Sequence, residues 1–193
     1  MSKLIFYYSA MNAGKSAQLL QKSHNLQSKR FAIKRYTYAL DDRFGPGKIA
    51  SRTGISADAD KFDKYIDFFI EHGRGARRYD YIFIDEAQFL TKAQVLQLTK
   101  LVDLYGISVF CYGLRTDFRG EPFEGATYLL AWADEMQEID SYDAKGNKAM
   151  MNMRIDHSGI RLWHGHQVQI GLNYESIHRS EFDLERALNN GLV

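Results

Sequence analysis

The chain has 193 residues, of which 45% are hydrophobic and 25% are charged, and this composition excludes disorder as a global description. Its 25 basic and 24 acidic side chains leave a formal net charge of +1, which argues against a tight nucleic-acid-binding protein and against a polybasic membrane anchor. The single cysteine, Cys111, excludes an internal disulfide framework and a cysteine-rich zinc ribbon, and it suits a reducing compartment.

Strands and helices alternate over the first two thirds of the chain. Aromatic and β-branched runs predict strands, and apolar residues at helical spacing predict helices. In chain order we expect a strand at residues 3–8, a helix at 17–28, a strand at 31–38, a mobile loop at 41–54, a helix at 62–72, a strand at 79–84, a helix at 92–105, a strand at 107–112 and a helix at 125–133. This alternation predicts an α/β fold with a parallel sheet.

The residues after about 140 break this rhythm. They alternate more, are richer in glycine and predict short strands and turns, followed by a helix near residues 183–188. We therefore expect two parts: an α/β domain over residues 1–140 and a small, mostly β lobe over residues 141–193.

The strongest local motif is SAMNAGKS at residues 9–16, between a predicted strand and a predicted helix. It matches the phosphate-binding loop G-x-x-x-x-G-K-[ST], except that a serine stands where the first glycine would be. In such a loop backbone N–H groups point at phosphate oxygens, the lysine reaches the β and γ phosphates, and the last hydroxyl binds Mg²⁺. The expected ATP-binding residues are Ser9, Ala10, Met11, Asn12, Ala13, Gly14, Lys15 and the magnesium ligand Ser16.

A second motif, YIFID at residues 81–85, is an apolar strand that ends in an acidic residue. Enzymes with a phosphate-binding loop place such a residue near Mg²⁺, so we expect Asp85 to hold the metal directly or through water. Glu86 follows it and can accept the proton of an attacking hydroxyl group. On these two motifs alone ATPases, GTPases, translocases and small-molecule kinases all remain open.

A set of segments in fixed order is more specific: FYYSAMNAGKS at residues 6–16, DDRFG at 41–45, IDEAQFL at 84–90 and YGLRTDFRGEPFEG at 112–125. Together they closely resemble the type II thymidine kinases, the bacterial-type cellular family. The resemblance implies nucleotide salvage by transfer of the γ-phosphoryl group of ATP, with Mg²⁺, to the 5′-hydroxyl of thymidine. It also implies a RecA-like domain, a small lobe whose lasso loop covers the nucleoside, and a homotetramer.

The family motifs assign roles to individual residues of this sequence. They make Glu86 the catalytic base and Asp85 the carboxylate on the metal side. They place Gln88 in the same strand-end motif, and Asp41 and Arg43 in a mobile loop on the phosphate side. By resemblance, these last three belong to the ATP site.

A nucleobase needs flat apolar surfaces and a few hydrogen-bond partners. Segments expected at the carboxyl edge of the sheet, where α/β proteins bind ligands, supply Met11, Phe89, Leu114, Phe118 and Phe123. Ordinary core packing is the alternative role for each aromatic. The resemblance adds Gly171 and Tyr174 from the lasso loop, which is shorter here than in the family.

The small lobe departs from the family, which usually holds zinc with two paired cysteines and a later cysteine/histidine pair. Here the first pair falls on Asp143 and Lys145 and the later pair on His178 and Glu181. A lysine must lose its proton before it can bind a metal, so the four-ligand site is broken. We expect a lobe without zinc, held by packing and a salt bridge; a three-ligand site of Asp143, His178 and Glu181 stays open.

Two other functions stay open. One is a nucleotide-binding regulatory protein derived from such a kinase, which the broken zinc site suggests. The other is a nucleic-acid-dependent ATPase, against which the near-neutral charge argues. No apolar run is long enough for a signal peptide or a membrane span, so we expect a cytoplasmic homo-oligomer with small-molecule partners and without membrane or nucleic-acid partners.

Overall fold

The computed structural model describes residues 1–43, 45–73, 79–167 and 173–182. Its centre is a six-stranded sheet in the order β5-β2-β6-β7-β1-β8, in which all neighbouring strands are parallel. The strands are β1 (Leu4–Ser9), β2 (Ile33–Tyr38), β5 (Asp60–Phe62), β6 (Tyr81–Ile84), β7 (Ser108–Leu114) and β8 (Glu135–Glu138). The predicted α/β fold with a parallel sheet is confirmed.

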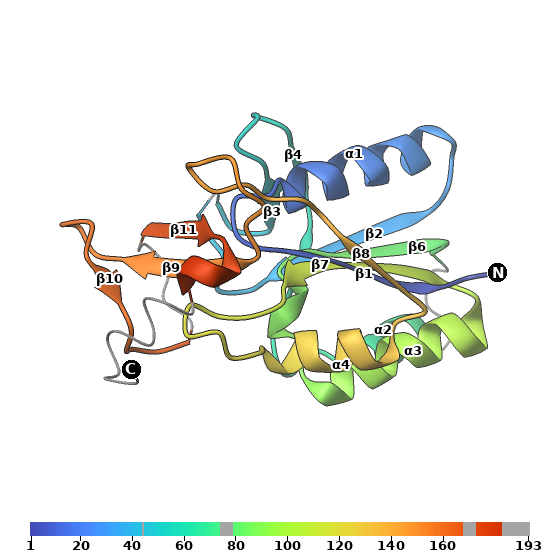
Figure 1. The fold of residues 1–193 in the computed structure, drawn as a ribbon. Coiled ribbons are helices and arrows are strands. Elements are labelled where there is room, and N and C mark those ends of the chain that lie inside the picture. Colours follow the sequence, from blue (N-terminus) through green and yellow to red (C-terminus); the bar gives the residue numbers. More distant parts are fainter. Residues whose placement is uncertain (44, 74–78, 168–172, 183–193) are drawn as a thin grey trace.

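Helices cover both faces of this sheet (Figure 1). Helix α1 (Lys15–Ser28) lies on one face. The other face carries α2 (Phe68–Gly73), α3 (Lys92–Tyr105), α4 (Glu124–Trp132) and the short 3₁₀ helix η1 (Ala87–Phe89). The sheet is therefore buried between two layers, as its apolar strands predict.

The central strands send alternate side chains into two separate apolar cores. On β1, Leu4 and Phe6 pack on the side of α3 and α4, whereas Ile5 and Tyr7 pack on the side of α1. The same alternation continues on β6 and β7. Full burial of one such side chain stabilises the fold by roughly 1.5–3 kcal/mol, so this pattern fixes which face of each strand meets which helix.

Helix α3 begins and ends as the sequence predicts. Thr91 Oγ1 accepts a hydrogen bond from the Gln94 backbone N–H at 3.2 Å, and Gln94 Oε1 accepts one from the Thr91 N–H at 3.0 Å. This pair forms a capping box. Gly106, with a φ of 67°, ends the helix in the left-handed conformation that glycine adopts without strain.

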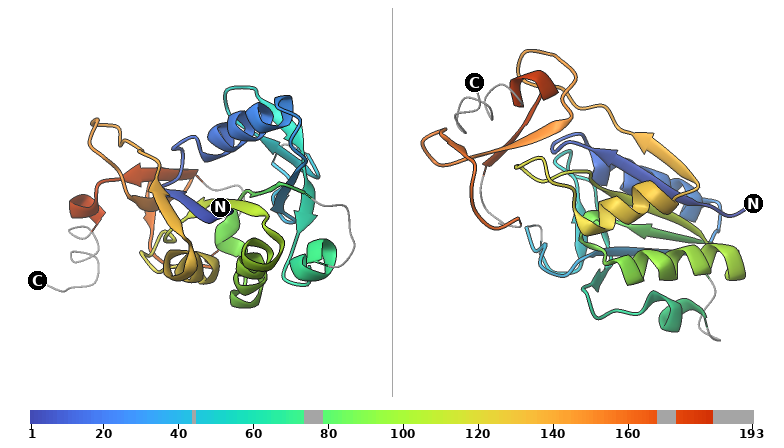
Figure 2. Two further views of the ribbon diagram at one scale, coloured as in Figure 1. Left: turned by 90° about the vertical axis from the view of Figure 1, so that its right-hand side faces the viewer. Right: turned by 60° about the horizontal axis from the view of Figure 1, so that its bottom comes forward.

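The residues after β8 form a separate antiparallel sheet in the order β10-β9-β11. Its strands are β9 (Met151–Ile155), β10 (Arg161–Leu162) and β11 (Asn173–Ile177). This small lobe lies beyond the carboxyl ends of the central strands (Figures 1 and 2). Met151, Ile177 and Phe182 form its apolar core. The boundary near residue 140 stays a prediction.

The helix predicted over residues 62–72 was wrong in its first half. Phe62 ends β5, a strand that pairs with β2. The chain then turns, because Asp63 Oδ1 accepts the backbone N–H groups of Tyr65 and Ile66 at 2.8 and 3.2 Å. The helix therefore begins only at Phe68.

The loop predicted over residues 41–54 also contains a strand. Strand β3 (Lys48–Ala50) pairs antiparallel with strand β4 (Ser56–Asp58). Ile49 is 1% exposed and packs in the core beneath α1, which anchors β3 to the domain. The helix predicted near residues 183–188 lies outside the described residues.

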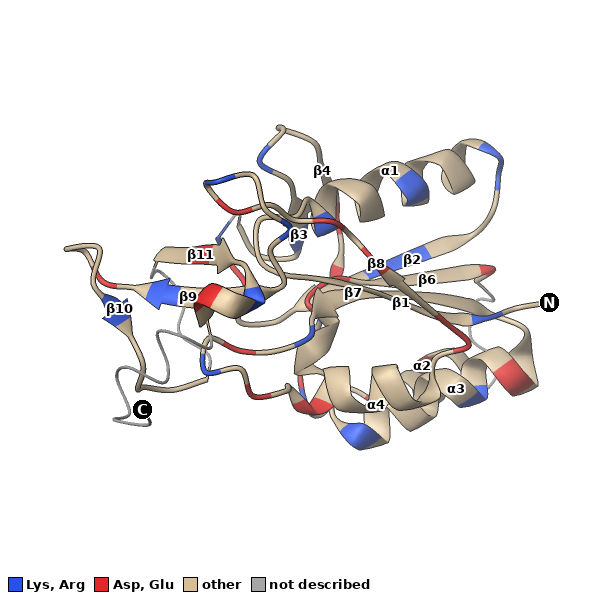
Figure 3. Cartoon of the chain, viewed as in Figure 1, with Lys and Arg blue, Asp and Glu red and all other residues tan. Residues whose placement is uncertain are grey.

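Lys and Arg residues alternate with Asp and Glu residues along the described elements (Figure 3). This distribution matches the near-zero net charge. Within the described part of the chain, no helix combines the length and hydrophobicity that crossing a bilayer requires.

Gly125, in the first turn of α4, lies against η1. A Cβ atom built there would lie 2.6 Å from the Ala87 carbonyl oxygen and 2.7 Å from that of Leu90, and these backbone atoms cannot move aside as a flexible side chain can. We therefore predict that Gly125→Ala lowers the free energy of unfolding by about 1–3 kcal/mol, measured by urea denaturation.

Gly73→Ala, at the end of α2, is the matched control. The atoms nearest to its Cβ atom would be side-chain atoms of Phe69 and Tyr105, at 3.4 Å or more. Equal destabilisation of the two variants would contradict the role given to the backbone contact.

Candidate functional site

The turn between β1 and α1 has the backbone shape of an anion-binding loop. Asn12 and Gly14 have positive φ values of 63° and 81°, and among the described residues no side chain caps the start of α1. The free N–H groups and the positive end of the helix dipole therefore face the turn. Together they offer a site for a phosphate group.

Lys15 folds back across this turn. Its Nζ atom donates to Ser9 Oγ at 2.9 Å and to the Ala10 carbonyl at 2.8 Å. Burial lowers the pKa of Lys15 to about 8, and this effect outweighs the charges of Glu86 and Asp85, which raise the pKa. A phosphate group can replace both hydrogen-bond partners of the ammonium group, and the phosphate contact of Lys15 stays a prediction.

The predicted magnesium ligands lie side by side. Ser16 Oγ donates to Asp85 Oδ2 at 2.8 Å. Asp85 is 4% exposed, and burial together with the charge of Glu86 raises the pKa of its carboxyl group, although the hydrogen bond from Ser16 opposes this. A buried carboxylate beside a hydroxyl group is stabilised by a cation, and Mg²⁺ prefers such oxygen ligands. These residues therefore fit a magnesium ion.

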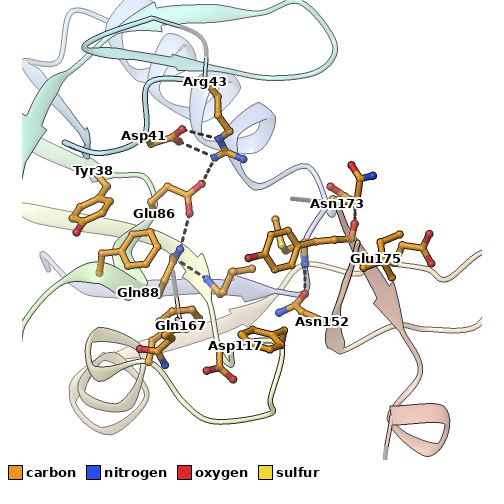
Figure 4. Close-up of a pocket in the computed structure, with 18 of the residues that line it drawn as sticks. Tyr38, Asp41, Arg43, Glu86, Gln88, Asp117, Asn152, Gln167, Asn173 and Glu175 are labelled. Carbon is orange, nitrogen blue, oxygen red and sulfur yellow. Dashed lines mark hydrogen bonds and ion pairs between the residues drawn. The ribbon is translucent and has the colours of Figure 1, made fainter. Parts of the chain in front are cut away.

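Glu86 leaves the line of β6 in a left-handed conformation, with φ 55° and ψ 37°. This conformation is uncommon for a residue with a side chain and persists where the surroundings fix it. Arg43 Nη2 donates to Glu86 Oε1 at 2.7 Å, and Gln88 Nε2 donates to Oε2 at 2.6 Å (Figure 4). Arg43 is itself held by two hydrogen bonds to Asp41, both of 2.7 Å. The Glu86 carboxylate is thus fixed by donors on both oxygens.

Gln88 anchors this arrangement to the sheet. Its side chain is buried, and its Oε1 atom accepts the backbone N–H of Leu114 at 3.1 Å. A Cβ atom on Gly113 would lie 2.8 Å from the same oxygen, so the glycine lets Gln88 approach β7. The resemblance assigns Gln88 to the ATP site, and the structure places it between Glu86 and β7.

A cavity of about 590 Å³ opens beside Glu86, a size that suits a small organic ligand. The predicted residues that line it are Met11, Asn12, Asp41, Arg43, Glu86, Gln88, Phe89, Leu114, Phe118, Phe123 and Tyr174. Figure 4 shows Asp41, Arg43 and Glu86 on one side and Asn152, Asn173 and Glu175 across from them. Gly171 lies outside the described residues.

The predicted aromatic residues serve both as cavity wall and as core. Phe118 is 1% exposed and Phe123 is 5% exposed. Phe123 meets Phe89 edge to face at 5.6 Å between ring centroids, and Phe89 packs on Tyr38 at 4.3 Å. Contact with a nucleobase and packing in the core therefore do not exclude each other for these residues.

Several lining residues were not predicted from the sequence, namely Tyr38, Asp117, Asn152, Ile155, Gln167, Asn173 and Glu175. A signal existed for Tyr38, which ends a predicted strand and so lies at the carboxyl edge of the sheet. Asp117, Asn173 and Glu175 are direct neighbours of the predicted residues Phe118 and Tyr174, whereas Asn152, Ile155 and Gln167 had no such signal.

The backbone of Met11 joins the phosphate-binding turn to the small lobe. Its N–H donates to Asn152 Oδ1 at 2.7 Å, and its carbonyl accepts from Ser141 Oγ at 3.2 Å and from Ser176 Oγ at 2.5 Å. Asn152 is 2% exposed and also donates to the Thr116 carbonyl at 2.9 Å. The small lobe thus uses both backbone groups of Met11, and Met11 also lines the cavity; its predicted place in the ATP site stays a prediction.

The positions that match the family's zinc ligands do not fit a zinc site. Lys145 and Glu181 form an ion pair, as expected for a lobe held by a salt bridge. Asp143 accepts the Lys145 backbone N–H at 2.9 Å, and His178 is hydrogen-bonded to a neighbouring serine. Among the residues that the structure describes, no group of three or more His, Cys, Asp or Glu side chains is arranged to hold a metal. The three-ligand alternative is therefore not assembled.

Comparisons with known proteins agree on one family. Residues 2–182 match the family described as thymidine kinase. A thymidine kinase of Pasteurella multocida is 48% identical over 192 residues, which is 97% of this chain and 100% of the relative. A thymidine kinase of Xanthomonas campestris pv. campestris is 49% identical over 187 residues, 94% of this chain and 90% of the relative. A thymidine kinase of Mannheimia succiniciproducens is 48% identical over 186 residues, which is 94% of this chain and 95% of the relative.

Proposed function

The chain belongs to the thymidine kinase family and is a kinase, and we propose that it transfers the γ-phosphoryl group of ATP to the 5′-hydroxyl of thymidine. The observation that supports this most directly is the position of Glu86, whose carboxylate lines a cavity of about 590 Å³ that also reaches Met11 and Asn12 of the phosphate-binding turn. Phosphoryl transfer to an alcohol needs a base beside bound phosphates, with room for the acceptor.

The triphosphate of ATP binds at the turn between β1 and α1. Lys15 exchanges its hydrogen bonds to Ser9 and Ala10 for phosphate oxygens. Ser16 and Asp85 would hold Mg²⁺, and the ion would supply positive charge that neutralises the phosphate oxygens. Arg43 and Arg52 also line the cavity and can offset the charge that develops during transfer.

Glu86 accepts the proton of the 5′-hydroxyl group while the hydroxyl oxygen attacks the γ-phosphorus in line. The new bond joins that oxygen to phosphorus, and the bond from phosphorus to the β-phosphate oxygen breaks, so that ADP leaves. Gln88 and Arg43 hold the carboxylate by its two oxygens, which orients its remaining lone pairs before the substrate binds.

The base of the nucleoside lies between the apolar walls of the cavity, which are formed by Met11, Leu114, Phe118, Phe123 and Tyr174. Deoxyuridine should also be accepted. It lacks only one methyl group, and one methyl group in an apolar pocket discriminates by only ~1–3 kcal/mol. Assembly as a homotetramer is a further part of the proposal and comes from the family alone.

Neither alternative function has an observation in its favour. A regulatory protein without activity would need the loss of a catalytic group, yet Lys15, Ser16, Asp85 and Glu86 lie together at one edge of the sheet. A nucleic-acid-dependent ATPase would need a basic stripe, whereas charges of both signs are interspersed along the described elements (Figure 3). Phosphorylation of a panel of deoxynucleosides with labelled ATP decides among the three.

Replacing the proposed base should abolish turnover while substrate binding persists. We predict that Glu86→Gln lowers kcat about 10²–10⁴-fold, because the amide keeps the shape of the side chain but cannot accept the proton. Steady-state kinetics and calorimetric binding of both substrates measure this. Glu121→Gln is the matched control, because Glu121 is an exposed residue between Phe118 and Phe123. Normal turnover by Glu86→Gln would refute the assignment of Glu86 as the base.

The low pKa of Lys15 predicts a pH dependence of ATP use. Below about pH 8 the side chain is charged and attracts phosphate, and above it the charge is lost. The kcat/KM for ATP, which reports on the free enzyme, should therefore fall roughly tenfold per pH unit above that value. The Lys15→Arg variant keeps its charge across this range, so its kcat/KM for ATP should not change with pH there. If kcat/KM falls at the same pH in the wild type and in the variant, the fall belongs to another group.

We propose that the small lobe folds without zinc. Purified protein should contain no stoichiometric zinc, and stripping with a zinc-selective chelator should leave its melting temperature unchanged. Glu181→Gln should cost at most about 1 kcal/mol of stability, because exposed ion pairs contribute little. One bound zinc per chain, whose removal lowers the melting temperature, would overturn this proposal.

A further inference from the structure

Strand β9 carries a buried arginine. Arg154 is 1% exposed and is the largest of the fully buried side chains among the described residues. Removing a guanidinium group from water is costly unless hydrogen bonds and stacking replace the lost hydration. Its contacts should therefore explain why the site requires an arginine.

Alternate side chains of β9 point to opposite faces of the small sheet. Met151 and Met153 pack with the apolar core of the lobe. Asn152 lies between them in sequence and lines the cavity. Arg154 shares the face of Asn152, so the side chain is directed toward the cavity side and away from the core of the lobe.

Three contacts of the guanidinium group reach different walls of the cavity. The group stacks on Phe118, 3.6 Å from the ring centroid. Its Nε atom donates to Tyr174 Oη at 3.0 Å, and Nη2 donates to the His166 carbonyl at 2.7 Å. The cavity is lined by Phe118, by Tyr174 and by Gln167, the residue after His166. Arg154 is not among the described lining residues, so it supports these walls from behind.

The geometry favours arginine over lysine. A planar guanidinium can stack on one ring and donate sideways to two acceptors at once, which a single ammonium point charge cannot do. Gly165 makes room for it, since a Cβ atom there would lie 3.0 Å from Arg154 Nη1.

We propose that Arg154 is a positioning residue for the nucleoside, fixing the orientation of Phe118 and Tyr174 from outside the cavity. This inference rests on the proposed function, because it assumes that a flat base binds between these walls. Walls fixed before binding reduce the ordering that the substrate must impose. The effect of Arg154 should therefore fall on nucleoside affinity, whereas Glu86 and the phosphate-binding turn should be unaffected.

The test compares Arg154→Lys with Arg161→Lys. Loss of the charged hydrogen bonds should raise the KM for the nucleoside about tenfold, with kcat and the KM for ATP changed less than about twofold. Arg161 is the matched control, because it stacks at 3.5 Å on Trp163, which is not among the described lining residues. An equal rise for Arg161→Lys, or a parallel loss of kcat and both affinities in Arg154→Lys, would overturn the proposal.

A second variant tests the same contact from the other side where Arg154→Lys is unstable. Tyr174→Phe keeps the ring but removes the hydroxyl oxygen that accepts from Arg154 Nε, so it should also raise the nucleoside KM, and an unchanged nucleoside KM would contradict the proposal. Where both variants fold, the effect of Tyr174→Phe should shrink when it is combined with Arg154→Lys, and full additivity would contradict the shared hydrogen bond. All comparisons use the deoxynucleoside that the wild-type protein phosphorylates fastest. The wild-type panel alone therefore shows whether the proposed acceptor is wrong, and the KM values of the variants alone show whether the role of Arg154 is wrong.

Discussion

The hydrogen bond of 2.8 Å between Ser16 and Asp85 joins segments that are 69 positions apart. It exists because β1, β7 and β6 are neighbouring parallel strands, which end at the same edge of the sheet. Their register is held by side chains that alternate between two apolar cores, and a slip by one residue would exchange the cores for every side chain. The geometry of phosphate and metal binding thus depends on hydrophobic packing in the middle of the sheet.

The same edge of the sheet also sets the orientation of Glu86, the proposed base. Glu86 would continue the direction of β6 in an extended backbone, but its φ of 55° turns it out of the strand toward the cavity. That conformation costs on the order of 1–3 kcal/mol and is balanced by the hydrogen bonds of Arg43 and Gln88. Gln88 is in turn bound to the Leu114 N–H, so the orientation of the carboxylate is set by the sheet itself.

The parts of the site that could be predicted from the sequence are local ones. The turn at residues 9–16 and the acidic end of β6 each lie within a few residues of a clear strand. Strand β5 was missed because only three residues form it, and pairing with β2 determines its structure. Asn152 was missed because its partner Met11 is 141 positions away. Nothing in the sequence marks Arg154 as buried, since a charged residue in a strand is usually exposed.

Met11 makes the two ends of the cavity interdependent. Three side chains of the small lobe hold its backbone, and Asn12 Nδ2 donates to the Tyr174 carbonyl at 3.3 Å. Each such bond contributes roughly 0.5–1.5 kcal/mol, more in sum than one exposed ion pair at the Lys145 end. The lobe is therefore held where it meets the phosphate-binding turn, and these bonds set how the nucleoside end of the cavity lies relative to that turn.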